Sequence, residues 1–477
     1  MFNDFESCYR ALEAKEGRFD GMFITAVTST GVYCRPSCPA ITPKRANVRF
    51  FPTAAAAQGA GFRACKRCRP DASPGSPEWN IRADTVARAM RLIADGVVDR
   101  DGVGGLARRL HLSERHLHRL LIAEVGAGPQ ALARAHRAQT GRLLIETTHL
   151  KFSEIAFASG FASIRQFNDT IREVFASTPT EMRAKKNRNS PSGPGVIELR
   201  LPYRAPMDTV TLFTFLAARA IPGIEESNGS SYRRTLRLPH SPGIVELRPQ
   251  TEHVACRFQL GDLRDLTAAV HRCRRLLDLD ADPVAIDSVL AVDPLLRPLV
   301  EQRPGLRVPG AVDGNELAFR AVVGQQISVK GALTIAGRVV KRFGKPLTVQ
   351  EGGLTHLFPE ADDLAEADLS TIGIPRKKQE SINHLAAELA AGDLVIDPGA
   401  DRDETRARLL ELPGVGPWTA SYIAVRALGD PGAFMDTDLG VRHALERLGV
   451  REEPALLAQR WKPWAAYAQQ HLWASLG

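Results

Sequence analysis

Four cysteines in two close pairs constrain this chain more than any other feature of its sequence. Cys34 and Cys38 are spaced C-x3-C, and Cys65 and Cys68 are spaced C-x2-C. Two short spacings separated by a small folded unit are what coordination of Zn²⁺ by four thiolates requires. Both pairs lie in turn-forming, Arg-rich sequence, where buried apolar cysteines would be out of place. We therefore predict that residues 1–75 fold around one zinc ion held by all four sulfurs.

The other three cysteines, Cys8, Cys256 and Cys273, have no partner at ligand spacing, and we expect them to be packing residues. Seven cysteines in 477 residues are too few for a disulfide scaffold and favour a reducing compartment. No apolar run approaches the ~18 residues that a membrane helix needs, and the first residues show no basic-then-apolar leader. We expect a cytoplasmic, nucleoid-associated protein with no membrane partner.

Composition divides the chain into segments, as its length leads us to expect. The fold class that we predict is multidomain and mainly α, with α+β parts. The charged and then Pro/Gly/Ser-rich stretch 187–195 cannot bury a core and predicts a flexible linker. The units that composition separates are residues 1–75, 80–186 and 196–477.

Residues 80–186 show apolar residues three and four positions apart, with Arg in most turns. Gly105–Leu120 predicts helix, tight turn and helix, with Ser113 as N-cap. The pattern recurs with Ser163 as the cap of a second such helix. Two recognition helices fit two segments of a major groove, and the alternative is a plain helical bundle with a solvated basic face. The outward residues that we expect to contact DNA are Arg115, His116 and Arg119 on the first helix, and Arg165, Gln166, Asn168 and Arg172 on the second.

Stretches of the first two domains carry a specific resemblance. Phe23–Val27, Thr30–Cys38 and Gly61–Cys68 resemble the N-terminal domain of the adaptive-response methyltransferase Ada, and residues 105–183 resemble the AraC-type tandem helix-turn-helix. The resemblance implies that Cys34 is both a zinc ligand and the irreversible acceptor of a methyl group from a DNA methylphosphotriester. It also implies an activator of transcription that acts on RNA polymerase. The basic neighbours of the cysteines, Arg45 and Arg63 among them, would attract the DNA backbone of the alkylated or promoter duplex.

The C-terminal segment combines a glycine hairpin with a later carboxylate. Leu412-Pro-Gly414-Val-Gly416-Pro predicts a helix, a tight hairpin and a second helix, whose free N–H groups can bind a DNA phosphate. About 20 residues later, Asp438 stands at a predicted helix start, where an anion can stabilise an oxocarbenium-like sugar. The alternative is an N-cap without chemistry. Three scarce aromatic residues, Trp418, Tyr422 and Trp473, suggest a stacking pocket for a flipped base.

Residues 196–477 resemble 3-methyladenine DNA glycosylase II of the AlkA type. The resemblance implies an α+β N-terminal subdomain over 196–310 and a helix-hairpin-helix glycosylase domain over 311–477. The matching stretches are Leu201–Pro206, Phe215–Ala220, Arg303–Gly310, Val323–Val329 and Arg460–Trp464. The match implies that Asp438 is catalytic, that Gln326 is the wedge that fills the vacated base stack, and that an alkali ion can bind at the hairpin. It places Trp418 where bifunctional relatives have a lysine, which implies a monofunctional enzyme. Leu439 replaces an aromatic residue of some members, and Asp436 offers a second carboxylate.

We thus expect a monomer that repairs methylphosphotriesters, activates transcription and excises alkylated purines. One alternative is a transcription factor whose zinc and helix-hairpin-helix units only bind DNA. Another is a DNA-binding protein whose four cysteines are all structural. The chain contains no Pro-Cys-His-Arg motif and no G-x-x-x-x-G-K-[ST] loop, so we expect neither O6-alkylguanine repair nor ATP use.

Overall fold

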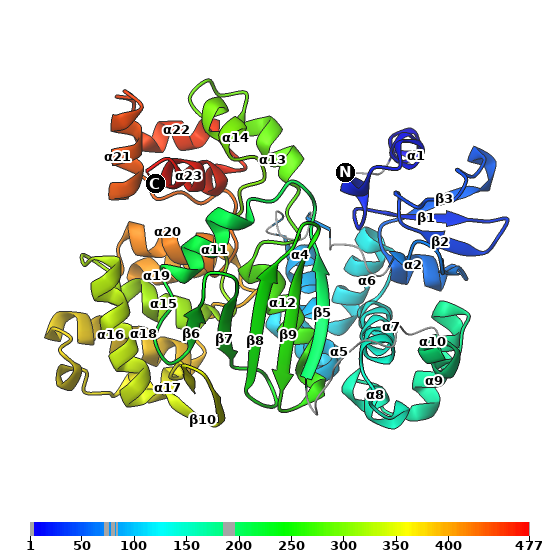
Figure 1. Cartoon of the computed structure of the whole chain (residues 1–477), viewed down its shortest axis with the longest axis horizontal. Helices are drawn as coiled ribbons and strands as arrows, with labels where there is room; N and C mark the ends of the chain where they lie inside the picture. The colour runs from blue at the N-terminus through cyan, green and yellow to red at the C-terminus, as the bar shows by residue number, and fades with distance from the viewer. Residues whose placement is uncertain (1–3, 71–75, 78–81, 83, 185–195, 477) are drawn as a thin grey trace. The chain divides into compact units, whose positions relative to one another are not determined.

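The computed structural model describes residues 4–70, 76–77, 82, 84–184 and 196–476. The predicted linker 187–195 lies outside these residues. The chain divides into two compact units. The first holds residues 1–204, 238–241 and 252–271, and the second holds 205–237, 242–251 and 272–477. Each unit is described by itself below, with the elements labelled as in Figure 1.

The first unit opens with a small four-stranded sheet of order β3-β1-β2-β4. β1 runs antiparallel to both β2 and β3, whereas β2 and the short β4 are parallel. The apolar side of the sheet packs on Cys8, Ala11 and Phe23, so that Cys8 is a packing residue as predicted. The elements are α1 (Phe5–Ala14), η1 (Gly17–Phe19), β1 (Ile24–Val27), β2 (Val32–Cys34), η2 (Arg45–Asn47), β3 (Val48–Phe51), α2 (Ala54–Gly59) and β4 (Arg63–Ala64).

Helices alone make up the next part of this unit, shown in cyan and blue-green in Figure 1. The long α7 contacts the helices before and after it, and its Leu132 and Ala133 belong to the core formed with the helices before it. The helices are α4 (Thr85–Ala94), α5 (Val97–Arg109), α6 (Glu114–Val125), α7 (Pro129–Thr147), α8 (Phe152–Ala158), α9 (Ile164–Phe175) and α10 (Pro179–Ala184).

β5 (Val196–Pro202) pairs antiparallel with β9 (His253–Leu260) in full register. Buried and exposed residues alternate along β5, because one face of the strand packs inward. Cys256 on β9 and Cys273 on α12 (Leu266–Leu276) are buried, which confirms both as packing residues.

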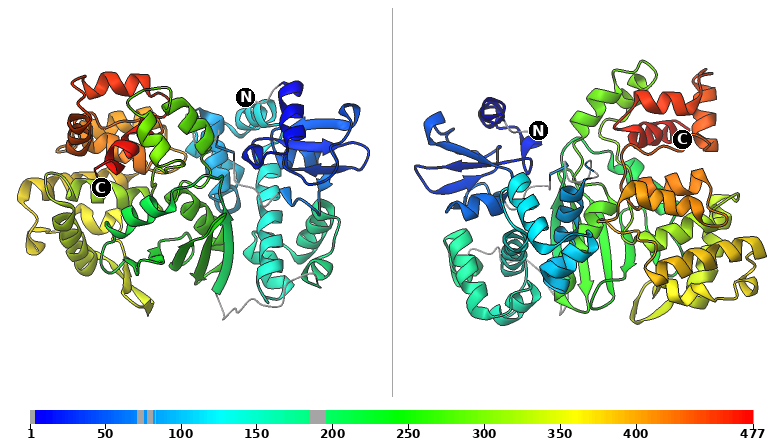
Figure 2. Two further views of the ribbon diagram at one scale, coloured as in Figure 1. Left: turned by 45° about the horizontal axis from the view of Figure 1, so that its top comes forward. Right: turned by 180° about the vertical axis from the view of Figure 1, so that it is seen from behind.

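The second unit contains an antiparallel ladder, a second small ladder and a large set of helices (Figure 2). α15 packs on α18 and α20, and the C-terminal α23 packs on α14, α21 and α22. The strands are β6 (Glu225–Ser227), β7 (Tyr232–Leu236), β8 (Gly243–Pro249), β10 (Lys345–Glu351) and β11 (Leu354–Leu357). The helices are α11 (Thr209–Ala217), α13 (Pro283–Leu290), α14 (Arg297–Gln302), α15 (Gly314–Val323), α16 (Val329–Phe343), α17 (Ala361–Ala365), α18 (Arg376–Ala391), α19 (Arg402–Glu411), α20 (Pro417–Arg426), α21 (Leu439–Arg447), α22 (Pro454–Arg460) and α23 (Ala465–Ala474).

The predicted fold class, multidomain and mainly α with α+β parts, is confirmed. Among the described residues, no helix has the length and apolar character needed to cross a membrane.

Candidate functional site

The four sulfur ligands predicted from the spacing converge. The Sγ atoms of Cys34, Cys38, Cys65 and Cys68 all lie within 4.8 Å of one another. The parallel pairing of β2 with β4 brings the two pairs together, because Cys34 ends β2 and Cys65 follows β4. Zn–S bonds of about 2.3 Å in a tetrahedron require sulfurs about 3.8 Å apart. The cluster therefore fits one zinc ion.

The protonation of the thiols supports this fit. A hydrogen bond between the two side chains raises the pKa of Cys34 and lowers that of Cys68 to about 6. The pKa of Cys38 rises to about 11 because its thiol is buried. Four thiolates this close cannot all be ionised without a cation, and zinc supplies that charge and keeps its ligands deprotonated.

Asp20 holds the first cysteine pair in place and was not singled out from the sequence. Its carboxylate is 3% exposed and accepts hydrogen bonds from the Ser37 N–H (2.9 Å) and the Ser37 hydroxyl (2.6 Å). Arg35 forms an ion pair with the same carboxylate at 3.0 Å. Ser37 and Arg35 lie between Cys34 and Cys38, so Asp20 fixes the loop that carries both ligands.

Two arginines near the cluster were predicted to face DNA. Arg45 forms an exposed ion pair with Glu6 at 2.7 Å and lies over the ring of Tyr9 at 4.6 Å. A phosphate would therefore have to exchange with Glu6, an exchange that costs little because exposed pairs are weak. Arg63 lies on β4, two residues before Cys65, and is half-buried.

Both predicted helix-turn-helix pairs are present. Ser113 caps α6 by accepting a hydrogen bond from the His116 N–H (3.3 Å), and Ser163 caps α9 through the Gln166 N–H (3.2 Å). Each helix has a buried apolar face and an exposed polar face. The predicted contact residues Arg115, His116, Arg119, Arg165, Gln166 and Arg172 are exposed, and Asn168 is half-buried.

The second unit contains a pocket of about 780 Å³. Residues of α11, α15, α16, α20, α21 and α23 line it, so segments far apart in sequence meet there. Of the predicted residues, Trp418, Tyr422, Trp473 and Asp438 all line this pocket. The exposed apolar residues Val210, Ile327, Val329 and Leu439 lie along it as well. The pocket therefore offers aromatic walls, apolar contacts and one carboxylate.

Asp438 is clamped by three N–H donors. Trp418 Nε1 donates to Oδ2 at 2.8 Å, Trp473 Nε1 donates to Oδ1 at 2.8 Å, and the Val441 N–H donates to Oδ1 at 3.0 Å. The last bond makes Asp438 the N-cap of α21. Asp438 is thus both the N-cap of α21 and the carboxylate that lines the pocket. The interpretation as an N-cap and the interpretation as a pocket carboxylate therefore do not exclude each other. Asp436 does not line the pocket.

The aromatic wall is compact. The rings of Trp418 and Tyr422 stack 5.3 Å apart at 15°, one turn from each other on α20. Gly440 lets the third ring approach, because a Cβ there would lie 3.1 Å from the indole of Trp473. Leu439, in place of an aromatic residue, is 69% exposed and contributes an apolar edge of the pocket.

The predicted hairpin joins α19 to α20. Gly414 has a φ of +79°, and a Cβ there would lie 2.0 Å from the hydroxyl of Ser381. Gly416 is the N-cap of α20, and a Cβ there would meet nothing within 4 Å. The backbone at Gly416 is therefore open to an approaching group, as binding of a phosphate at the helix N-terminus requires.

Gln326, the predicted wedge, is exposed in a left-handed turn with a φ of +58°. Lys378 stabilises this turn, because its Nζ donates hydrogen bonds to the carbonyls of Val323 (3.0 Å) and Gln325 (2.7 Å). The Gln325 side chain donates to the carbonyl of Gly414 at 2.9 Å. The wedge turn and the hairpin are therefore connected. No sequence pattern points to Lys378.

Comparison with known families matches four described domains. The "Metal binding domain of Ada" matches residues 7–71 and a helix-turn-helix domain matches 106–185. The "AlkA N-terminal domain" matches 198–313, and the "HhH-GPD superfamily base excision DNA repair protein" matches 319–465.

One relative spans the whole chain. It is the "Probable bifunctional transcriptional activator/DNA repair enzyme AlkA" of Mycobacterium tuberculosis, 57% identical over 482 residues, 100% of this chain and 97% of the relative. The chain belongs to this AlkA family of bifunctional activators and repair enzymes. The bifunctional AlkA architecture thus joins an Ada zinc domain and helix-turn-helix to a DNA glycosylase.

Other relatives cover only the C-terminal part. The DNA-3-methyladenine glycosylase 2 of Escherichia coli is 32% identical over 285 residues, 58% of this chain and 97% of that protein. The solved 3-methyladenine DNA-glycosylase from Archaeoglobus fulgidus shares the fold, with a TM-score of 0.51 and 24% identity over 58% of this chain and 97% of its own.

Proposed function

We propose that the second unit excises alkylated purines of the 3-methyladenine and 7-methylguanine type as a monofunctional glycosylase. The observation that carries this proposal is the clamp on Asp438, because it fixes an acceptor-only carboxylate at the wall of an aromatic pocket. A flipped base stacks between Trp418 and Tyr422 on one side and Trp473 on the other. Asp438 offsets the positive charge that develops at C1′ as the C1′–N bond breaks and its electron pair leaves with the base.

An alkylated purine that is cationic leaves as a neutral base, so this step needs no general acid. Water then adds to C1′ and releases a proton, which leaves an abasic site. Gln326 fills the vacated stack, and the N-terminus of α20 at Gly416 holds a phosphate, in the hairpin formed with Gly414. An alkali ion at the hairpin carbonyls belongs to the same proposal. Release of 7-methylguanine from a single-lesion duplex by the full chain, with an intact abasic strand as product, is the direct test.

We further propose that Cys34 accepts a methyl group from a DNA methylphosphotriester in a single turnover. The Cys34 sulfur forms a bond to the methyl carbon while the carbon–oxygen bond breaks, and the electron pair stays on the phosphate oxygen. The product is a thioether, so the cysteine cluster loses one negative charge and its repulsion of DNA phosphates falls. Mass spectrometry of the protein after incubation with methylated DNA should show one added methyl on Cys34. Retained zinc without this adduct would favour four structural cysteines.

The helix-turn-helix pairs connect this chemistry to transcription. In the proposed function α6 and α9 read promoter DNA, the methylated protein activates through RNA polymerase, and the protein acts as a monomer associated with the nucleoid. The domain boundaries 1–75, 80–186, 196–310 and 311–477 remain part of this proposal. A factor whose C-terminal unit only binds DNA would release no base, so the excision assay separates it from the glycosylase.

A further inference from the structure

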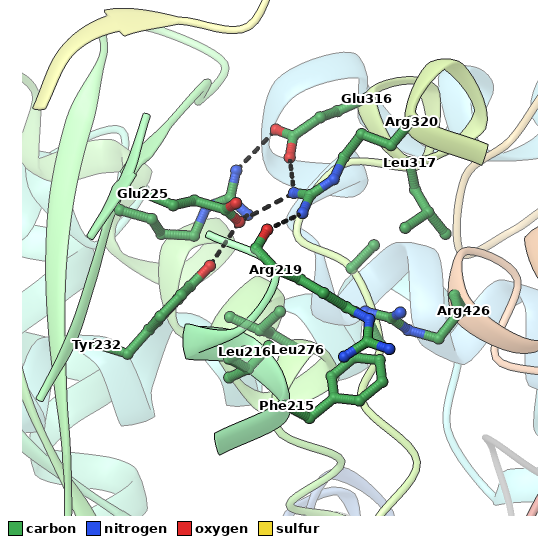
Figure 3. A pocket seen from close by; sticks show the side chains of 13 residues that line it. Phe215, Leu216, Arg219, Glu225, Tyr232, Leu276, Glu316, Leu317, Arg320 and Arg426 are labelled. Carbon is green, nitrogen blue, oxygen red and sulfur yellow. Dashed lines mark hydrogen bonds and ion pairs between the residues drawn. The ribbon is translucent and has the colours of Figure 1, made fainter. Parts of the chain in front are cut away.

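A small void that shares Phe215, Arg219 and Arg320 with the lining of the large pocket is surrounded by more positive than negative side chains. Four arginines and two glutamates lie together there (Figure 3). They are Arg219, Arg234, Arg320 and Arg426, with Glu225 and Glu316. The void between them measures only about 20 Å³, which leaves room for about one water molecule.

Both glutamates are already fully engaged. Glu225 accepts from Arg234 at 2.9 Å and from Arg320 at 3.0 Å through one oxygen, and from the Ile221 N–H at 2.9 Å through the other. Glu316 accepts from the same two arginines at 2.7 and 3.0 Å. Burial alone would raise the pKa of Glu225, but Arg320 and Arg234 lower it to about 2. The two carboxylates therefore neutralise Arg234 and Arg320.

Arg219 is left without such a partner. Its guanidinium lies 3.8 Å over the ring of Phe215 and lines the large pocket, and no described residue accepts a hydrogen bond from it or pairs with its charge. Arg426 lies over the same ring at 4.8 Å, but it donates to the Tyr422 hydroxyl at 2.8 Å. Figure 3 shows the Arg219 side chain directed toward Phe215 and away from the glutamates.

A guanidinium without a carboxylate partner in the wall of the pocket does not fit a pocket that binds only cationic bases. Burial lowers the pKa of Arg219, and Arg426 and Arg320 act in the same direction. A guanidinium nevertheless stays protonated at neutral pH, so it repels a cationic base. Its five N–H donors would instead be satisfied by an oxygen or nitrogen acceptor on a base.

We infer that Arg219 is a specificity-determining residue that donates hydrogen bonds to the oxygen at C6 of a flipped purine. The inference rests on the proposed excision function and adds a substrate preference to it. Arg219 then favours 6-oxopurines, and it allows an uncharged 6-oxopurine to be excised. When an uncharged purine departs, the C1′–N9 electron pair leaves negative charge on the base, and Arg219 stabilises that charge through the C6 oxygen. The water that adds to C1′ gives up the proton that neutralises the base.

Guanine in a normal pair carries the same oxygen, but it must first leave a stable stack and pair. A mispaired 6-oxopurine avoids much of this cost.

The test compares three bases in single-turnover release by the full chain. Oligonucleotide duplexes carry either one 7-methylguanine, which is cationic and has the C6 oxygen, or one deoxyinosine, which is uncharged and has it. Methylated genomic DNA supplies 3-methyladenine, which is cationic and lacks it. Arg219→Ala should lower hypoxanthine release from deoxyinosine about 10- to 100-fold, the range of a hydrogen bond to a charged group. Release of 7-methylguanine should fall less, and 3-methyladenine release should stay unchanged or rise.

Two further variants make the test specific. Arg219→Lys keeps the charge and a donor and should restore most hypoxanthine release. Arg303→Ala removes another arginine that lines the pocket, whose guanidinium is engaged with the Thr211 hydroxyl at 2.8 Å. It should change the three rates by similar factors. Thermal melting of each variant checks that the fold is kept.

Equal losses on all three bases in Arg219→Ala would overturn the inference, since they would indicate packing on Phe215 or a phosphate contact. Wild-type release of 3-methyladenine without release of hypoxanthine would overturn it as well. If the wild-type protein released none of the three bases, the proposed function itself would fail.

Discussion

The indole of Trp473 donates a 2.8 Å hydrogen bond to the carboxylate of Asp438, 35 residues earlier in the chain. This bond ties the last helix, α23, to the N-terminus of α21. Since Trp418 donates to the other carboxylate oxygen, the acid cannot rotate without losing one of the two bonds. The aromatic walls of the pocket therefore set the position of the carboxylate.

Asp438→Asn should lose base excision and keep DNA binding. Asn caps a helix about as well as Asp, so α21 should stay folded, while the negative charge that is proposed to face C1′ is removed. We expect the rate of 7-methylguanine release to fall about 10²- to 10³-fold, with duplex binding in a gel-shift assay unchanged. The matched control is Asp436→Asn, which should excise normally. An active Asp438→Asn together with an inactive Asp436→Asn would reverse the assignment.

Metal removal should separate the two proposed activities. The four cysteines lie in the first unit, and Asp438 with its clamp lies in the second. A chelator should therefore abolish methyl transfer to Cys34 and lower the stability of the zinc domain, while the rate of base release stays the same. Zinc content, Cys34 methylation and excision are measured on one sample. Parallel loss of both activities would contradict this prediction.

Alanine substitutions at the two hairpin glycines should affect different properties, stability at Gly414 and DNA binding at Gly416. Gly414→Ala puts a methyl group 2.0 Å from the Ser381 hydroxyl at a positive φ, so we expect a loss of about 1–3 kcal/mol in the free energy of unfolding. Gly416→Ala meets nothing within 4 Å, so stability should hardly change. Its methyl group would instead obstruct an approaching phosphate and weaken DNA binding. Denaturant unfolding and duplex affinity distinguish the two; a stable Gly414→Ala would contradict the packing argument.

Lys378→Met should impair excision through the wedge. Met keeps the apolar stem but loses both hydrogen bonds to the carbonyls below Gln326. We expect duplex excision to fall about 10-fold, the equivalent of about 1.4 kcal/mol, and single-stranded excision to fall less, since no stack is refilled there. The exposed Lys377→Met serves as the control. Equal effects on duplex and single strand would indicate a general loss of structure.

His471 should make stability depend on pH. Its side chain is 2% exposed, and burial lowers its pKa to about 4 from 6.5. The unfolded chain then binds a proton that the folded chain excludes, so stability is full above about pH 6.5 and falls as the pH drops toward 4, by up to about 3 kcal/mol. Buried Asp278, with a pKa raised to about 6, acts in the opposite direction. The measurement is therefore the free energy of unfolding of the wild type and of His471→Gln, obtained by chemical denaturation at pH 4.5 and at pH 7.5. The loss between pH 7.5 and pH 4.5 should be larger for the wild type. An identical pH dependence of the two proteins would refute this prediction.

Patterns that lie close together in sequence allowed much of this structure to be predicted. The cysteine spacings, the caps Ser113 and Ser163, and the Pro-Gly hairpin are local, because each is fixed by a few neighbouring residues. Asp438 was also found, since a helix start after a hairpin is visible in sequence. Contacts between residues far apart in sequence are decided by packing. Asp20 beside the cysteine loop, Lys378 beneath the Gln326 turn and Arg219 in the wall of the pocket were therefore missed. The four-residue spacing of Phe215 and Arg219 is the one local signal that could have indicated their stacking.

Because the indoles of Trp418 and Trp473 both donate to Asp438, the carboxylate and these two walls of the pocket cannot move independently. A substitution that widened the pocket at Trp418 or Trp473 would also release the carboxylate, so activity and lesion range cannot be altered independently on that side. Phe215 on α11 and Arg219 just after it are not among the residues that donate to the carboxylate of Asp438. Substitutions on α11 could therefore reshape the pocket for a new kind of damaged base without displacing the carboxylate, whereas substitutions at Trp418 or Trp473 would displace it.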